Sequence, residues 1–153
     1  MTIQTFATTL TEHGTSAHIV LPFDPVAVWG VRPRYHVTGS VNTIAVRGAL
    51  KQIDGHYALT LGPAWLRDGR ITPGSTVTVT LALEGPQADE LADDITTALH
   101  AHPTANAFFA GLPTFYRKKY LRWIDGTKGK PLVRAQRIAE MITLLAAGQR
   151  ERP

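Results

Sequence analysis

The feature of the sequence that most constrains the fold is the stretch from Leu112 to Leu145, which shows helical periodicity on both sides of a short Gly/Lys turn. Pro113 suits the first turn of a helix, where a missing N–H costs little. Gly126 ends this helix, and Pro131 opens the next one. Because both helices are amphipathic and the turn between them is short, this stretch predicts an antiparallel helix hairpin.

Each of these two helices has an apolar stripe. In the first helix the stripe consists of Leu112, Tyr116, Tyr120, Trp123 and Ile124. In the second helix it consists of Ala135, Ile138, Ile142, Leu145 and Ala146, with Met141 at its edge. Lys118, Arg122 and Arg137 lie away from the stripes, whereas Arg134 lies along the second one. The Arg134 guanidinium either snorkels to water or clamps a carboxylate or phosphate with two hydrogen bonds.

The first half of the chain shows the period-two alternation of short strands separated by turn signals. Six strands are expected, at Ile3–Leu10, Ala17–Phe23, Tyr35–Val41, Ile44–Leu50, His56–Leu61 and Thr76–Leu83. Asp24–Pro25 predicts the start of a short helix, and Gly62–Arg67 predicts another. Thr11–Gly14 reads as a turn, and Asp54–Gly55 predicts a type I′ hairpin turn. Six short strands favour a small closed barrel, because closure removes exposed edges.

The sequence therefore predicts an α+β protein with two domains. A β-barrel domain is expected at residues 1–85 and a helical module at residues 86–153, with Pro86 at the start of the linker. Within the helical module, helical spacing over Leu91–Leu99 and a short apolar segment at Pro103–Ala110 predict two helices ahead of the hairpin.

The helical part resembles a known bacterial family. The matching residues are Phe108–Phe109, Leu112–Pro113, Arg117, Tyr120–Ile124, Lys128 and Arg134–Ala139, which look like the C-terminal module of proteins labelled YdeI/OmpD-associated or bacteriocin-protection. The chain departs from the family's pattern around the turn. Asp125–Lys130 stands where the family often has Glu-Ala-Lys, and Val133 stands where it often has Thr. By association, the resemblance implies protection against an antibacterial compound.

The N-terminal part resembles the domain of unknown function 1905. The matching residues are Pro22–Asp24, Val28–Arg32, Val37–Asn42 and Pro73–Val79. This resemblance implies a double-split β-barrel, distantly like the barrels of bacterial AbrB-type regulators. Together the two resemblances cover nearly the whole chain.

The net charge of +4 hides an asymmetry. Residues 112–153 hold ten Lys/Arg and three Asp/Glu, a net of +7, whereas residues 1–111 hold six and nine, a net of −3. Five acids between Glu84 and Asp94 follow one another without an intervening base. Either this acidic segment complements the basic helices within the fold, or the basic helices meet an acidic external partner.

Composition limits the compartment and the chemistry. The absence of cysteine removes disulfide frameworks, thiolate metal sites and a Cys nucleophile together. No apolar run approaches the length of a membrane span, so no membrane partner is expected. Residues Met1–Phe6 lack the basic segment and apolar run of a signal peptide, and a cytoplasmic location is therefore expected.

The residue patterns of common catalytic sites are missing from the sequence. The six histidines are scattered and form no HExxH pattern, so no metal is expected. Gly-rich phosphate loops and nucleophile-elbow serines are also missing, and no cofactor is expected. Asp93 and Asp94 are adjacent on a predicted helix and point apart. We therefore assign no catalytic residue.

What remains is a set of aromatic and cationic side chains. The candidate ligand-binding residues are Trp29, Arg32, Arg34, Trp65, Tyr116, Tyr120 and Arg134. An indole beside arginines can hold a planar anionic ligand. The alternative is that the indoles fill the core and that the tyrosine face packs against the barrel or a neighbouring helix.

These observations favour a non-enzymatic protein that binds a small molecule or short peptide, as a monomer or a homodimer. An alternative is nucleic-acid binding, suggested by the sequence pI near 9.7, the basic helices and the AbrB-like barrel. Against this alternative, the barrel half is acidic and contains no recognised DNA-reading motif. An enzyme with an unrecognised site is a third alternative.

Overall fold

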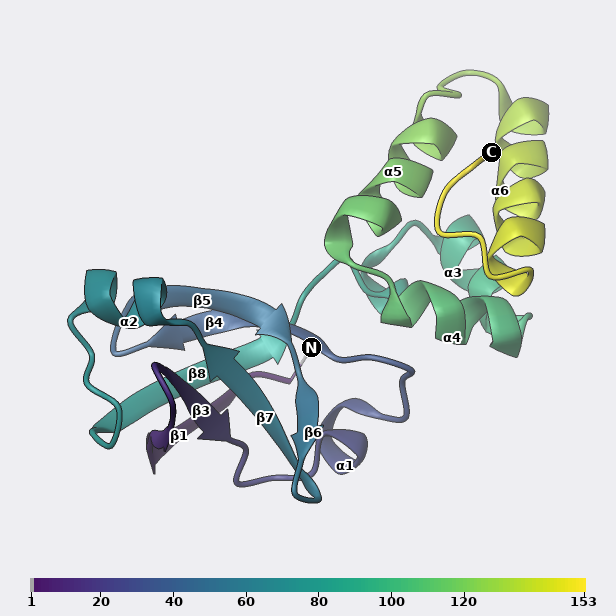
Figure 1. Cartoon of the computed structure of the whole chain (residues 1–153). Helices are drawn as coiled ribbons and strands as arrows, with labels where there is room; N and C mark the ends of the chain where they lie inside the picture. Colours follow the sequence, from purple (N-terminus) through teal and green to yellow (C-terminus); the bar gives the residue numbers. More distant parts are fainter. Residues whose placement is uncertain (1) are drawn as a thin grey trace. The chain divides into compact units, whose positions relative to one another are not determined.

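The structure is a computed structural model that describes residues 2–153, with the backbone alone for Asp89. The chain forms two compact units, which are described separately. The first, the β unit, comprises the residues up to Val31 and Tyr35–Leu83. The second, the helical unit, comprises Arg32–Arg34 and Glu84–Pro153. Figure 1 shows the strands in the purple to teal part of the chain and helices α3 to α6 in the teal to yellow part. The protein is thus α+β, with N-terminal sheets and C-terminal helices.

The β unit contains two four-stranded antiparallel sheets and two short helices. Its strands are β1 Gln4–Thr9, β2 Thr11–His13, β3 Ser16–Val20, β4 His36–Val41, β5 Ile44–Ala49, β6 Lys51–Ile53, β7 His56–Leu61 and β8 Thr76–Leu83. Its helices are α1 Pro25–Trp29 and α2 Pro63–Gly69. One sheet has the order β1-β8-β4-β5 and the other has the order β2-β3-β7-β6. Among the described residues, no strand pairing joins the two sheets into the closed barrel that was expected.

The number of strands also differs from the expected six. Thr11–His13, which was expected to be a turn, forms β2. The chain passes from one sheet to the other at Leu10, between β1 and β2, and again at Leu50, between β5 and β6. At both points the backbone forms a hydrogen bond outside the paired residues of the strands. Leu10 N–H donates to Ser75 O, and Leu50 N–H donates to Tyr35 O. A three-residue strand that was not expected therefore follows each leucine, β2 after Leu10 and β6 after Leu50.

Alternation and close backbone approach organise the core of the β unit. Val77, Val79, Leu81 and Leu83 of β8 are all buried, as their alternation predicted. Gly39 of β4 lies opposite Leu81 in the register between β4 and β8. A Cβ at Gly39 would lie 1.7 Å from the Thr80 carbonyl oxygen, so glycine is required at this position.

The expected turns and caps of the β unit are present. Asp54 and Gly55 both have positive φ, 50° and 79°, as a type I′ turn requires, which confirms the predicted hairpin. Asp24 caps α1, since its Oδ1 accepts a hydrogen bond from Val26 N–H at 3.0 Å.

The helical unit contains a short 3₁₀ turn and four α-helices. They are η1 Ala88–Glu90, α3 Asp93–His100, α4 Pro103–Gly111, α5 Thr114–Asp125 and α6 Pro131–Ala146. Helix α6 packs against α3, α4 and α5. The core is formed mainly by Ile95, Leu99, Phe109, Tyr120, Ile124, Met141 and Leu145.

Two details of the expected helix faces are wrong. Met141, expected at the edge of the α6 stripe, is fully buried, whereas Ala135, expected within the stripe, is exposed. The buried stripe of α6 is therefore rotated toward Met141, because α6 packs against three helices and not one. In the described chain, no helix combines the length and apolar character that crossing a membrane requires.

Candidate ligand-binding site

The helical unit carries a hollow of about 340 Å³ that brings two of the candidate residues together. Arg34 and Tyr116 both line it, and Arg150, which the sequence reasoning did not select, lines it as well. Pro33, Phe108 and Leu112 supply apolar and aromatic surface. Its volume falls at the small end of the range for ligand sites, about 300–1,000 Å³. The hollow thus combines cationic side chains with apolar walls.

One wall of this hollow is the segment Arg32–Arg34. Arg32 Nη1 donates to Gln87 Oε1 at 2.7 Å, and Gln87 is buried. Pro33 lies against Gly111 at the end of α4, where a Cβ on Gly111 would be only 2.5 Å from Pro33 Cγ. The glycine therefore allows the segment to approach α4, and this approach places Arg34 at the hollow.

Another part of the lining, Gly148 and Arg150, comes from the C-terminal tail, residues 148–153. Gly148 has φ 78°, and Gln149 N–H donates to Leu144 O at 2.9 Å, which ends α6 and turns the chain back. The Tyr120 hydroxyl then donates to Gln149 O at 2.7 Å. As a result, the Arg150 guanidinium lies over the Tyr116 ring, 5.2 Å from its centre.

The ion pairs of the described residues leave Arg34 and Arg150 without a carboxylate partner. Burial, followed by the negative charge of Glu151, raises the pKa of Tyr120, so its hydroxyl stays protonated and donates to the tail at neutral pH. The hollow therefore presents two available guanidinium groups beside an aromatic ring.

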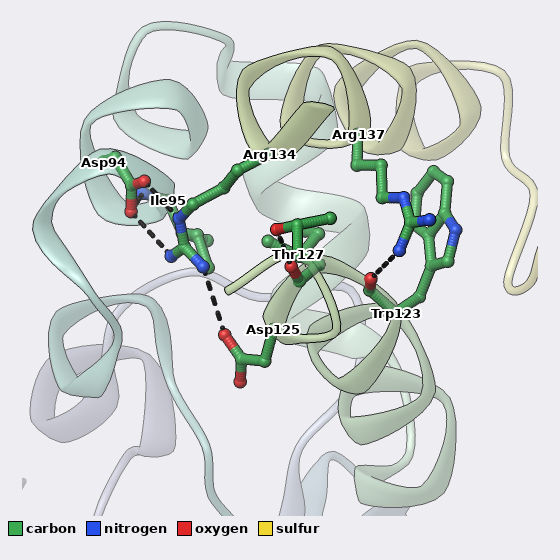
Figure 2. Close-up of polar contacts among 8 residues, drawn as sticks. Asp94, Ile95, Trp123, Asp125, Thr127, Arg134 and Arg137 are labelled. Atoms are coloured by element: carbon green, nitrogen blue, oxygen red, sulfur yellow. Dashed lines mark hydrogen bonds and ion pairs between the residues drawn. The ribbon is translucent and has the colours of Figure 1, made fainter. Parts of the chain in front are cut away.

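Arg134 binds carboxylates of the chain itself (Figure 2). Its Nε and Nη2 donate to the two oxygens of Asp94 at 2.6 and 3.0 Å, and its Nη1 donates to Asp125 at 3.3 Å. These contacts raise the pKa of Arg134, and the Arg134 hydrogen bonds lower the pKa of Asp94. The Arg134 guanidinium therefore does not simply extend to water. It forms the bidentate contact with a carboxylate, and that carboxylate is Asp94 of α3.

The two candidate tryptophans lie in the β unit. Trp29 is 6% exposed, donates its indole N–H to Thr2 O at 2.9 Å and packs edge-on against Phe23. It therefore fills the core of that unit. Trp65 is half-buried, donates to Ala45 O at 3.0 Å and lines a separate hollow of about 400 Å³ together with Arg47.

Tyr120 and Arg32 support the hollow from outside its lining. Tyr120 is 2% exposed within the helical core and reaches the tail with its hydroxyl alone. Arg32 holds the segment that carries Arg34. Within the helical unit, the structure thus gives Arg34 and Tyr116 positions in the lining and gives Tyr120 and Arg32 positions behind it.

Arg117 is a buried charge that the sequence reasoning did not select. It is 0% exposed, and its Nη1 donates to Pro86 O at 3.2 Å. Its Nε and Nη2 have no hydrogen-bond partner among the described residues. Desolvation lowers the pKa of Arg117, and the charge of Glu84 acts in the opposite direction. The signal for its burial was the helical phase, because Arg117 precedes buried Ile124 by seven residues and so lies on the same face.

By fold and site geometry, the chain is a small α+β protein whose main candidate hollow lies in the helical unit. Residues 90–148 match the family described as Bacteriocin-protection, YdeI or OmpD-Associated, and residues 6–81 match a domain of unknown function (DUF1905). These two matches confirm the resemblance seen in the sequence. A comparison with curated proteins finds no match.

Proposed function

We propose that the protein is a non-enzymatic binding protein that holds a small molecule or short peptide in the hollow of the helical unit. The observation that carries this proposal is that Arg34 and Arg150, which form no ion pair with the described carboxylates, both line a hollow whose other walls are aromatic and apolar. Ligand sites combine apolar linings with a few oriented polar groups in this way.

The family description supports a protective role for such binding. The description of the matched family refers to bacteriocin protection. A protein that holds a toxic compound lowers its free concentration without any chemical step. The binding proposal therefore accounts for that description with no catalytic residue.

We further infer that the two sheets form one double-split barrel of the AbrB type and that α5 and α6 form an antiparallel hairpin. The breaks at Leu10 and Leu50 support the first inference, because each lets one continuous segment contribute to both sheets. The short connection from Gly126 to Lys130 supports the second, since helices joined by few residues usually run antiparallel.

The basic residues of α5 and α6 support nucleic-acid binding less well than the sequence suggested. Arg137 was expected away from the apolar stripes, but its Nη1 donates to Trp123 O at 2.6 Å and it is only half-exposed. Arg134 is bound to Asp94 and Asp125. The exposed cations of α5 are Lys118, Lys119 and Arg122, and Lys119 pairs with Glu151.

The test is a screen of small organic compounds against ¹⁵N-labelled protein, followed by amide chemical shifts. Compounds that bind are expected to shift the amide signals of Arg34, Tyr116 and Gly148. Arg34→Gln is expected to lower the affinity of these compounds. Arg122→Gln is the matched control, because it removes the same charge from the exposed side of α5.

Two results would contradict the proposal. The first is hits that shift only residues around Trp65, which would move the site to the β unit. The second is a set of hits limited to duplex DNA, with an affinity that falls steeply as salt rises.

A further inference from the structure

The C-terminal tail belongs to the candidate site and not merely to the end of the last helix. Four contacts hold the tail, and each of them is made to a side chain on one face of α5. Arg150 lies over Tyr116, Glu151 pairs with Lys119, Gln149 O accepts from Tyr120, and Arg152 lies over Trp123. Helical spacing explains this, because residues three, four and seven apart share a face. The tail is therefore tied down along two turns of α5.

Of these tail residues, Arg150 and Gly148 line the hollow. Arg152 is outside the lining, since its guanidinium lies 4.4 Å from the centre of the Trp123 ring. The position of Arg150 depends on the residues on either side of it, because Gln149 is held by the Tyr120 hydroxyl and Glu151 is held by Lys119. Tyr120 and Lys119 thus fix the backbone that carries Arg150.

The charge of the hollow comes from two segments that are remote in sequence, Arg34 and Arg150. An acid group of a ligand that enters the hollow meets two guanidinium groups that form no ion pair among the described residues. Charge-assisted hydrogen bonds of this type are about twice as strong as neutral ones. A flat apolar body suits the remaining walls of Phe108, Leu112 and Pro33. A neutral ligand of the same shape would gain only the contacts with these apolar walls.

We propose that the hollow selects organic anions, namely carboxylates attached to a flat apolar body, and that Arg150 makes this selection from a tail held in place by Tyr120. Arg150 is the specificity-determining residue and Tyr120 is a positioning residue. This inference rests on the proposed binding function, because it names the chemical class of ligand for the same site.

The test compares two probes of equal shape, 2-naphthoate and 2-naphthamide, by titration of the labelled full-length protein. Naphthoate is expected to bind at least about tenfold more tightly, since one added charged hydrogen bond is worth a factor of that order. Arg150→Gln should lower the ratio of naphthoate to naphthamide affinity severalfold, because it removes one of the two guanidinium groups of the hollow. Arg152→Gln is the matched control, with the same substitution in the same tail outside the hollow, and should keep the preference.

Tyr120→Phe tests the positioning role, because it keeps the buried ring and removes only the hydroxyl that holds Gln149. It should lower the ratio of naphthoate to naphthamide affinity. A merely structural loss would weaken both probes equally, and that result would overturn the role of Tyr120.

The remaining outcomes separate this inference from the proposed function. If both probes shift the amides around Arg34 and Tyr116 with equal affinity, the binding function stands and selection of anions is overturned. Persistence of the full preference in Arg150→Gln would overturn the assignment of specificity to the tail. If neither probe binds and the compound screen gives no hit in the hollow, the proposed function itself fails.

Discussion

The Arg137 guanidinium on α6 donates to the backbone carbonyl of Trp123 on α5 at 2.6 Å and lies 5.3 Å from the centre of the same residue's indole ring. The last carbonyls of a helix have no partner within it. Gly126 N–H satisfies Arg122 O, Thr127 N–H satisfies Ile124 O, and Arg137 satisfies the carbonyl between them. Arg137 therefore caps the C-terminal end of α5 from a neighbouring helix.

Arg137→Ala should lower the free energy of unfolding by about 1–2 kcal/mol, because it removes a charge-assisted hydrogen bond and uncovers one face of the indole. Urea unfolding at neutral pH measures this loss. Lys118→Ala is the control, since it removes one exposed positive charge from α5 without a cap. Equal urea midpoints for the two variants would mean that the cap contributes nothing to stability.

A substitution at the close approach of β4 and β8 should cost more stability than Arg137→Ala does. Gly39→Ala would place Cβ at 1.7 Å from Thr80 O and 2.7 Å from Thr80 C, both backbone atoms that cannot move without breaking the ladder. A loss of about 3 kcal/mol or more, or failure to fold, is expected. Gly62→Ala is the control, because a Cβ there meets no atom within 4 Å. Thermal unfolding followed by circular dichroism compares them, and similar melting temperatures would contradict this register.

Much of the β unit could be predicted because its signals are local. The alternation of Val77 and Val79 and the positive φ demanded at Asp54–Gly55 act within a few residues. The strands β2 and β6, which follow Leu10 and Leu50, were missed, because strands of three residues are too short to show a clear alternation.

The candidate site was predicted in part for a related reason. The sequence pointed to Arg34 and Tyr116 as cationic and aromatic residues, but only the fold brings them to one hollow. Arg150 was missed because its position depends on a turn at Gly148 and on a hydrogen bond from Tyr120. Gly148 could have indicated this position from the sequence, since a glycine just after a helix often reverses the chain.

Thr43 offers a stabilising change. It has φ 76°, a conformation that costs a β-branched residue about 1–2 kcal/mol and costs glycine little. Thr43→Gly should raise the free energy of unfolding by about 0.5–1 kcal/mol, after the greater freedom of glycine in the unfolded chain is subtracted. Thr78→Gly, at an exposed site within β8, should lower it by about 0.5–1 kcal/mol. Losses of equal size in both variants, measured by urea unfolding, would show that Thr43 is not strained.

The pair formed by Asp94 and Arg134 predicts an acid-dependent loss of stability. Hydrogen bonds from Arg134 hold the pKa of Asp94 below its ordinary value. The resulting stability is fully present above the unfolded-state pKa of about 3.9 and is lost as pH falls through the lower folded-state value. Because the Asp94 side chain is 48% exposed, the contribution should stay below about 1 kcal/mol.

Asp94→Asn should therefore narrow the difference in unfolding free energy between pH 7 and about pH 3. Asp93→Asn is the neighbouring control and should leave that difference unchanged. Urea unfolding at the two pH values gives both numbers. The ion pair would have no part in acid stability if the two variants behaved alike.

His18 on β3 predicts a second pH dependence, at higher pH. The residue is 7% exposed, its Nδ1 lies 3.2 Å from Thr60 Oγ1, and its Nε2 has no partner among the described residues. Burial, followed by the charges of His13 and Lys51, lowers the pKa of His18. The folded protein therefore holds the neutral imidazole more readily than the unfolded chain does.

For a histidine whose pKa is lower in the folded state, the unfolded chain binds more protons between the two pKa values, so stability rises with pH in that window. This contribution is fully present above the unfolded-state pKa of about 6.5 and is lost as pH falls below it. The melting temperature should thus decrease from about pH 7.5 to about pH 5. His18→Gln should flatten this decrease, whereas His100→Gln, at an exposed position on α3, should not. An equally steep decrease in His18→Gln would assign the pH dependence to other groups, because glutamine cannot take up a proton in this range.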